Sequence, residues 1–178
     1  MRYALVVRKT AILDLEADGL LIPTTRDLVV GGNFGLALSR AAGPEFQAAC
    51  RRIAPVELGG AAVTPAGDLK ALIVIHAACI SLGQTTKMLL ERSYVRGLEL
   101  AEQSGIQSVA TPAFAIPAAG MKMEETTALL VRLMKEALDR GTVIQQVVFA
   151  VPNVDMFQAY SEACAAETPE DETAEDEE

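Results

Sequence analysis

Three short, mainly apolar segments limit the fold of this chain more than any other feature. They span residues 71–76, 107–113 and 147–151, and the last reads Val-Val-Phe-Ala-Val. A strand with one solvated face alternates apolar and polar residues, so a strand that is apolar throughout must be covered on both faces. Segments of helical periodicity separate these strands. The sequence therefore predicts an α/β fold, a three-layer α/β/α sandwich with a mixed, largely parallel central sheet.

The remaining elements follow from periodicity and from glycine and proline positions. Further strands are expected at residues 3–7, 19–22 and 59–65, and helices at residues 34–42, 45–53, 86–104, 123–140 and 156–164. Gly43-Pro44 separates the first two helices, because glycine and proline both interrupt helical structure. No linker or repeat divides the chain, so we expect one domain over residues 1–163 and a tail over residues 164–178.

The acidic residues are unevenly distributed, and this limits the partners to be expected. The net charge is −9, but residues 167–178 hold eight of the 24 acidic residues and no basic one. Such a segment cannot bury apolar surface, so we expect a disordered tail and a nearly neutral folded body. A neutral body with 4% aromatic residues argues against nucleic-acid binding.

Cysteine usage and hydropathy indicate the compartment. Cys50, Cys79 and Cys164 are odd in number and widely spaced, which fits neither a zinc site nor a disulfide framework. Uninterrupted apolar runs are too short for a signal peptide or a membrane span. We therefore expect a cytoplasmic protein that has reduced thiols and no membrane partner.

A glycine-rich turn that leads directly into a helix is the strongest functional signal. It reads Gly31-Gly32-Asn33-Phe34-Gly35. Glycine lets the backbone approach a ligand closely, and the first N–H groups of a helix have no partner within the helix. Such a turn suits an anion such as phosphate. Glycine before a helix can also serve only to let the chain turn, without any ligand.

Other candidate reactive groups are read as structural. His76 is the single histidine and lies in an apolar strand without obvious partners, so we interpret it as a core residue. Cys79 would need a lowered pKa and a base to act as a nucleophile. Asp14, Glu16 and Asp18 alternate with apolar residues and suggest a solvated turn. We therefore predict no catalytic residue, no metal site and no cofactor.

In order and spacing, five segments resemble the macrodomain family, whose members bind ADP-ribose and related nucleotides. The resemblance covers roughly residues 8–160. It rests on Asp18-Gly19-Leu20-Leu21, on Gly31-Gly32 through Arg40-Ala41-Ala42-Gly43-Pro44-Glu45, on Gly60 through Thr64-Pro65-Ala66 with Leu69, on Val74-Ile75-His76, and on Ser108-Val109-Ala110-Thr111-Pro112-Ala113.

The ligand-binding segments depart from the family pattern. The family's adenine-binding aspartate falls on Ala11, and the asparagines that hold the distal ribose and serve the hydrolytic members fall within Ile22-Pro23-Thr24-Thr25. The family's Val-Asp after the glycines falls on Asn33-Phe34. The second phosphate loop falls on Ala115-Ile116-Pro117, where proline has no N–H to donate. Aliphatic, proline and phenylalanine side chains cannot transfer a proton, so the resemblance implies binding of an ADP-ribose-like or another phosphorylated nucleotide without hydrolysis.

Two further readings stay open. The fold could serve as a protein interaction or assembly module, homo-oligomers included, with Ile22, Phe34, Ile116, Pro117 and Met121 as the contact patch. It could also carry an activity whose residues the sequence does not reveal. The predicted ligand-binding residues are Ile12, Thr24, Thr25, Gly31, Gly32, Asn33, Phe34, Gly35, Ala115, Ile116, Ala118, Ala119, Gly120, Met121 and Asn153.

Overall fold

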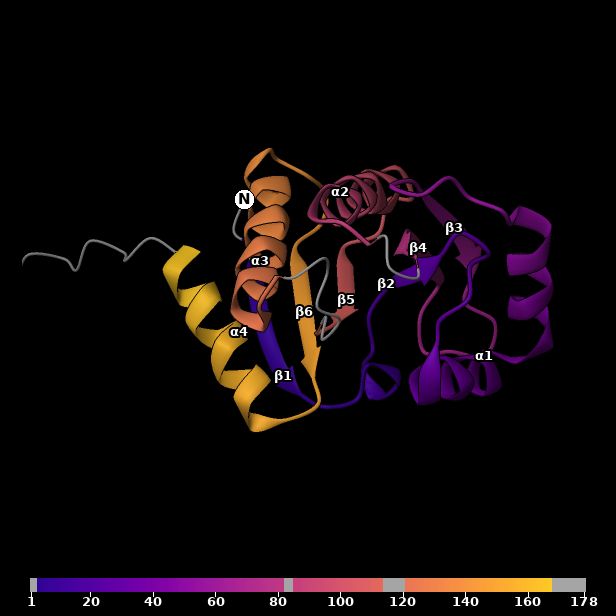
Figure 1. Ribbon diagram of the computed structural model, residues 1–178, viewed down its shortest axis with the longest axis horizontal. Coiled ribbons are helices and arrows are strands. Elements are labelled where there is room, and N and C mark those ends of the chain that lie inside the picture. Colours follow the sequence, from indigo (N-terminus) through magenta and orange to yellow (C-terminus); the bar gives the residue numbers. More distant parts are fainter. Residues whose placement is uncertain (1–2, 82–84, 114–120, 168–178) are drawn as a thin grey trace, which may run out of the picture.

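A six-stranded sheet forms the centre of the computed structural model, which describes residues 3–81, 85–113 and 121–167 (Figure 1). The strand order is β1-β6-β5-β2-β4-β3, and β3 alone pairs antiparallel to its neighbour. The strands are β1 (Ala4–Lys9), β2 (Gly19–Thr25), β3 (Ala61–Pro65), β4 (Ile73–Ile80), β5 (Ser108–Pro112) and β6 (Gln146–Val151). The predicted mixed, largely parallel sheet is confirmed.

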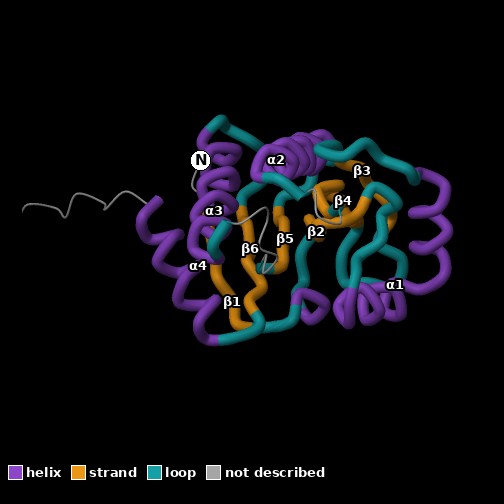
Figure 2. The backbone as a smooth tube through the Cα atoms, viewed as in Figure 1, coloured by secondary structure: helices purple, strands orange, loops and turns teal. Residues whose placement is uncertain are grey.

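Helices cover both faces of this sheet, as Figures 1 and 2 show. One face packs against α2 (Lys87–Gln103), α3 (Met123–Asp139) and α4 (Val154–Glu167), and the other against α1 (Gly32–Ile53) and the short helix η1 (Ile12–Asp14). Each face has its own apolar cluster. The expected three-layer α/β/α architecture is therefore confirmed.

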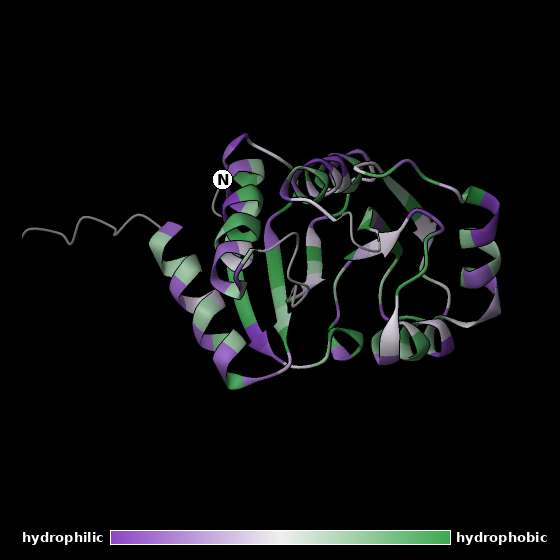
Figure 3. Cartoon of the chain, in the orientation of Figure 1, coloured by the Kyte–Doolittle hydropathy of each residue, from purple (hydrophilic) through white to green (hydrophobic). Residues whose placement is uncertain are grey.

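The central strands are buried because both of their faces are covered. In β6, Val147, Phe149 and Val151 contribute to the cluster under α2, α3 and α4, whereas Val148 and Ala150 contribute to the cluster under α1. In Figure 3, β6 is coloured mostly as hydrophobic, whereas β1 ends in hydrophilic residues and the helices carry hydrophilic residues on their outer sides. This arrangement explains the apolar segments from which the fold was predicted.

Helix α1 consists of two helical segments that meet at a kink. Gly43 has φ +80° and ψ −178°, outside the helical region, and Pro44 begins the second segment. This backbone conformation favours glycine, whereas the one close neighbour of a β-carbon at this position would be Oδ2 of the exposed Asp68 side chain, which is free to move. The interruption predicted at Gly43-Pro44 is confirmed.

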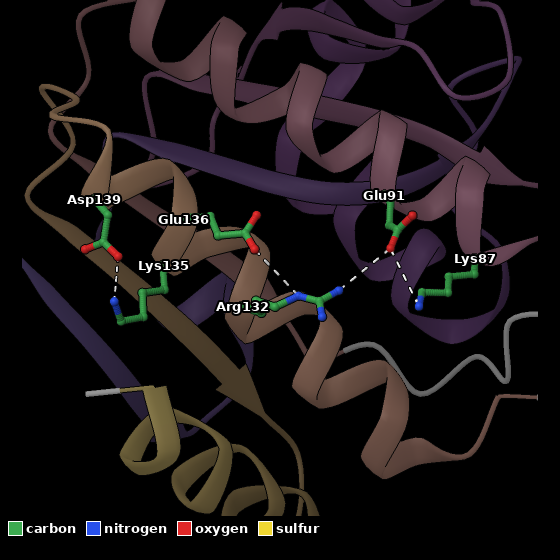
Figure 4. Close-up of polar contacts among 6 residues, drawn as sticks. All are labelled: Lys87, Glu91, Arg132, Lys135, Glu136 and Asp139. Atoms are coloured by element: carbon green, nitrogen blue, oxygen red, sulfur yellow. Dashed lines mark hydrogen bonds and ion pairs between the residues drawn. The ribbon is translucent and has the colours of Figure 1, made fainter. Parts of the chain in front are cut away.

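Ion pairs join α2 to α3 on the outer surface (Figure 4). Oε1 of Glu91 lies 3.9 Å from Nζ of Lys87 and 3.9 Å from Nη2 of Arg132. Nε of Arg132 also lies 3.7 Å from a carboxylate oxygen of Glu136. These side chains are solvent-exposed to a third or more, so each pair contributes little stability.

The last helix extends past its expected end at residue 164. Helix α4 continues to Glu167, and Cys164 is buried between α4 and the rest of the domain. The residues after Glu167 lie outside the described ranges, so the expected disorder of the tail stays a prediction. Within the described ranges, each helix is too short or too polar to cross a bilayer.

Candidate ligand-binding cleft

Strand β2 is the switch point of the sheet, where successive connections of the chain lead to opposite sides. The candidate ligand-binding cleft lies at this switch point. From β2 the chain continues to β3 and β4 on one side of the sheet, and β5 and β6 lie on the other side. In open α/β sheets, ligands bind beyond the carboxyl ends of the strands at such a switch point. Here β2 and β5 pair at only two positions, Gly19 with Val109 and Leu20 with Ala110, before they diverge.

Asp18 joins β2 and β5 at their amino-terminal ends, which lie away from the cleft. Its Oδ2 accepts hydrogen bonds of 2.9 Å from the backbone N–H groups of Gln107 and Ser108, and its own N–H donates to Oγ of Ser108. Burial acts to raise the pKa of Asp18, but these hydrogen bonds keep it below its ordinary value. The carboxylate is therefore a structural clamp rather than part of the solvated turn that we predicted.

A cleft of about 750 Å³ occupies the carboxyl edge of the sheet. It extends from the segment after β1, past the ends of β2, β4, β5 and β6, to the first turns of α1. Its described walls are Thr10, Ala11, Ile12, Leu13, Pro23, Thr25, Val30, Gly31, Phe34, Ala37, Ile80, Pro112, Ala113, Ala150 and Pro152. A cleft of this size has room for a nucleotide-sized ligand.

The glycine turn borders this cleft. Helix α1 begins at Gly32, and its N-cap residue Gly31 lines the cleft and has no capping side chain. Gly32 has φ +68°, which favours glycine, and the N–H of Gly35 donates to the carbonyl of Gly31 over 3.3 Å. The N–H groups before Gly35 have no partner within the helix, so the first turn can offer donors to an anion.

Polar side chains are scarce in the described walls. Thr10 and Thr25 supply the two hydroxyl groups, and Oγ1 of Thr25 accepts a 3.3 Å hydrogen bond from the N–H of Val29, which leaves the Thr25 O–H free to donate. All other described lining residues are glycine or apolar. The described part of the cleft thus contains no side chain that could act as a general acid or base near neutral pH.

Four residues of the predicted site line the cleft: Ile12, Thr25, Gly31 and Phe34. Gly32 and Asn33 are exposed in the first turn of α1 beside it. Ala115, Ile116, Ala118, Ala119 and Gly120 lie outside the described residues. Whether these residues contact a ligand stays a prediction.

The structure places four other predicted residues away from the cleft. Thr24 is completely buried, and its Oγ1 has no hydrogen-bond partner among the described residues. Gly35 is buried and lines a separate, smaller cavity, and Met121 borders a groove with Lys87 and Glu125. Oδ1 of Asn153 accepts a 2.9 Å hydrogen bond from the N–H of Met156 and so caps α4.

Most of the walls were not among the predicted site residues. Val30, Ala37, Ile80, Ala113 and Ala150 are small or aliphatic residues at strand or helix ends, and their identity carries no chemical signal. Their position in the sequence does indicate a ligand site, because they lie in or beside segments that follow parallel strands. The missed residues could therefore have been found from topology, but not from residue type.

The buried histidine and cysteine are not part of the cleft. Nε2 of His76 lies 2.9 Å from Oγ1 of Thr64, and Phe46 stacks against the ring; burial lowers the pKa of His76 to about 4. Burial raises the pKa of Cys79 to about 11, the opposite of what a nucleophile needs. Among the described residues, no three His, Cys, Asp or Glu side chains are grouped so that they could hold a metal ion.

The sequence model of the Macro domain family matches residues 23–130, which include part of the cleft and the glycine turn. The chain belongs to this family. The resemblance found from the sequence is thereby confirmed, and the matched segment runs from the end of β2 through α1, β3, β4, α2 and β5 into α3.

Relatives and solved structures extend this result. An uncharacterized protein of Mycobacterium tuberculosis is 32% identical over 163 residues, which are 91% of this chain and 45% of that protein. This macro domain thus spans less than half of that relative. A Salmonella typhimurium protein named O-acetyl-ADP-ribose deacetylase is 29% identical, with 90% of this chain and 94% of the relative covered.

A crystal structure of a Trypanosoma brucei macrodomain in complex with ADP-ribose has a similar fold. It superposes with a TM-score of 0.79 at 20% identity over 89% of this chain and 68% of that one. At this level of identity the similarity establishes the fold of this macro domain but not its ligand.

Proposed function

We propose that this macro domain binds ADP-ribose or a related phosphorylated nucleotide in the cleft and does not hydrolyse it. The observation that carries the proposal is the position of Gly31 and the first turn of α1, which border an open cleft at the switch point of the sheet. The trypanosomal macrodomain was crystallised with ADP-ribose, which supports the same ligand class here. Backbone donors at a helix N-terminus bind phosphate without a charged side chain.

The residues at the hydrolytic positions support binding without turnover. Ile22 is completely buried, Pro23 lines the cleft without a transferable proton, and Phe34 follows Asn33 in the first turn of α1. The sequence of residues 114–120, which lie outside the described ranges, contains no acidic residue, histidine or cysteine. General acid or base catalysis would need such a group in reach of the ligand.

Calorimetric titration with ADP-ribose, AMP and inorganic phosphate tests binding. We expect heat with the nucleotides and a loss of about tenfold or more in affinity for Gly31→Leu, because the added side chain projects into open space beside the helix N-terminus. Ala41→Leu, at an exposed position of α1 outside the cleft, is the matched control. Absence of heat with all three compounds contradicts the proposal.

Turnover needs a separate assay, because a Salmonella relative is named as a deacetylase. Purified protein is incubated with O-acetyl-ADP-ribose and with ADP-ribosylated protein, and the products are separated by chromatography. We expect both substrates to remain intact. Release of acetate or ADP-ribose at enzymatic rates contradicts the proposal of binding without hydrolysis, because it requires a proton-transferring group in the cleft.

An interaction module is the second candidate. Val29 and Leu36 are 57% and 59% exposed and flank the glycine turn, which favours a contact surface there. Ile22 was a wrong choice for such a surface because it is completely buried. Sedimentation analysis distinguishes the two candidates: a stable dimer that Leu36→Asp dissociates, together with no nucleotide binding, favours the module.

We also propose a cytoplasmic location. The three cysteines are buried and unbridged, and burial raises the pKa of the Cys50 thiol as well as those of Cys79 and Cys164. Reduced thiols of this kind suit a reducing compartment. Fractionation of cells that express the full-length natural protein tests the location.

A further inference from the structure

A second hollow lies between the two helical segments of α1 and the turn after β2, apart from the ligand-binding cleft. It is the cavity that Gly35 lines, and it has a volume of about 180 Å³. Val30 is the one described residue that lines both this cavity and the cleft. Apolar cavities of about 150 Å³ hold molecules the size of benzene, so this hollow, which we call the α1 cavity, has room for a small organic molecule.

The walls of the α1 cavity are held in place by hydrogen bonds and by an unusual backbone conformation. Nε2 of Gln47 donates to the carbonyl of Ser39 over 3.2 Å and so connects the two segments of α1 across the kink. In the turn after β2, the N–H of Leu28 donates to the carbonyl of Thr25, and Leu28 has φ +58°, which residues other than glycine seldom adopt. Such strained positions persist only where the surroundings hold them, and they are frequent at ligand sites.

The inner part of the α1 cavity is apolar. Leu28, Leu38 and Phe46 line it, and all three side chains are buried. Water beside such walls makes few hydrogen bonds, so an apolar group that displaces it gains free energy. The inner part of this cavity therefore suits a small aliphatic side chain.

The outer part of the α1 cavity carries two opposite charges. Asp27 and Arg51 both line the cavity and are exposed, and among the described residues neither forms an ion pair. Burial raises the pKa of the Cys50 thiol, and the positive charge of Arg51 acts against this rise, so the guanidinium lies near a thiol of the cavity wall. A carboxylate and a guanidinium beside an apolar hollow are complementary to a ligand with an ammonium group, a carboxylate and an apolar side chain.

We propose that the α1 cavity binds a small apolar amino acid, such as leucine, in its zwitterionic form. Its ammonium group lies at Asp27, its carboxylate at Arg51, and its side chain between Leu28, Leu38 and Phe46. This site is separate from the cleft and does not depend on which nucleotide the cleft holds. A ligand with one of the two charges satisfies half of the polar site, and a ligand without the side chain leaves the apolar part to water.

Nuclear magnetic resonance titration of the full chain with L-leucine tests the site. We expect saturable shifts of the Ser39 and Gln47 amide signals, which report on the α1 cavity, and none at Ile12 and Ala113, which line the cleft. Glycine, which lacks the side chain, should bind about tenfold more weakly or worse. 3-Methylbutylamine and 4-methylpentanoate keep the side chain but lack one charge each, and each should bind about threefold more weakly.

Three outcomes of these titrations overturn the proposal. One is the absence of saturable shifts with leucine, and another is a set of shifts confined to the cleft. The third is equal binding of leucine and either of the two singly charged compounds, because the zwitterion would then gain nothing from one of the two charges.

Arg51 and Arg52 form a matched pair for testing the carboxylate contact. Both are exposed in the last turn of α1, but only Arg51 lines the cavity. We expect Arg51→Gln to weaken leucine binding about threefold and to leave 3-methylbutylamine, which has no carboxylate, unchanged. Arg52→Gln should change neither affinity. Equal effects of the two substitutions, or an equal loss for both ligands in Arg51→Gln, overturn the assignment of Arg51 to the carboxylate.

Discussion

His76 lies on β4, between β2 and the edge strand β3, and is completely buried beside Thr64, Cys50 and Phe46. Nδ1 has no hydrogen-bond partner among the described residues, and burial lowers the pKa of the ring to about 4. The folded state thus holds the neutral imidazole, whereas in the unfolded chain the ring titrates near pH 6.5. As the pH falls below the unfolded pKa, the unfolded chain binds a proton at His76 and the folded protein does not, so protonation favours unfolding. The free energy of unfolding is therefore highest above the unfolded pKa and falls as the pH decreases toward the folded pKa.

We predict that the free energy of unfolding falls by about 2 kcal/mol between pH 7.5 and pH 5.0 because of this histidine. Urea unfolding at the two pH values measures the loss. Carboxylates with lowered pKa, such as Asp18, lose their contribution only at lower pH. His76→Gln should be less stable at pH 7.5 but should lose less on acidification. The same loss in wild type and His76→Gln contradicts this assignment.

The sequence analysis assigns both Thr24 and Thr25 to the ligand site, whereas the structure places Thr25 in the cleft wall and buries Thr24. Alternate residues of a strand face opposite sides, so one of two neighbours is expected to face the ligand. The pairing of β2 with β4 shifts register between Thr24 and Thr25, which are paired with Ala78 and Ile80. Thr24 is buried and Thr25 lines the cleft. Such an irregularity depends on the partner strand and leaves no mark in the local sequence.

Among the elements, α1 depends most on a single backbone conformation. Gly43 adopts φ +80° with ψ −178°, a region that is open almost solely to glycine. We predict that Gly43→Ala lowers the free energy of unfolding by about 2 kcal/mol, measured by urea unfolding. Ala41→Gly, on an exposed face of the same helix, is the control and should cost about 1 kcal/mol or less. Equal stability of Gly43→Ala and wild type would mean that the kink relaxes.

Strands β2 and β5 owe their juxtaposition to Asp18 at one end, because they separate at the other. We predict that Asp18→Ala removes about 2–3 kcal/mol of stability, since two backbone N–H groups lose a charged acceptor. Ligand affinity at a temperature where the variant is folded should stay within about twofold, because Asp18 lies at the end away from the cleft. Chemical unfolding and calorimetry measure the two effects, and a large loss of affinity without loss of stability contradicts this role.

Element types and order were predictable because they depend on local periodicity and on glycine and proline signals. Helix α2 was expected at residues 86–104 and is found at Lys87–Gln103, where the Thr86 side chain accepts from the N–H of Leu89. Ends were less predictable: β4 continues to Ile80, four residues past the expected end at residue 76, because pairing with β2 extends it. Local patterns do not contain such long-range pairing.

At the scale of the whole molecule, acidic charge is concentrated after Glu167. Residues 168–178 carry seven acidic residues, and a chain that ends at Glu167 changes in net charge from −9 to −2. The whole protein thus repels anions more than its folded body does, and the described cleft walls offer no charged side chain to offset this. Screening limits such repulsion to about 10 Å at 0.1 M salt and extends it to roughly 30 Å at 0.01 M.

We predict that truncation after Glu167 leaves the melting temperature unchanged, because every described element ends by that residue. At 0.01 M salt the truncated protein should bind AMP about two- to threefold more tightly than the full chain, and at 0.15 M salt the two should bind alike. Calorimetry at both ionic strengths measures this difference. A full chain in which residues 168–178 keep their length but have Gln and Asn for Glu and Asp should behave like the truncated protein. If only truncation raises the affinity, the segment affects the cleft by contact and not by charge.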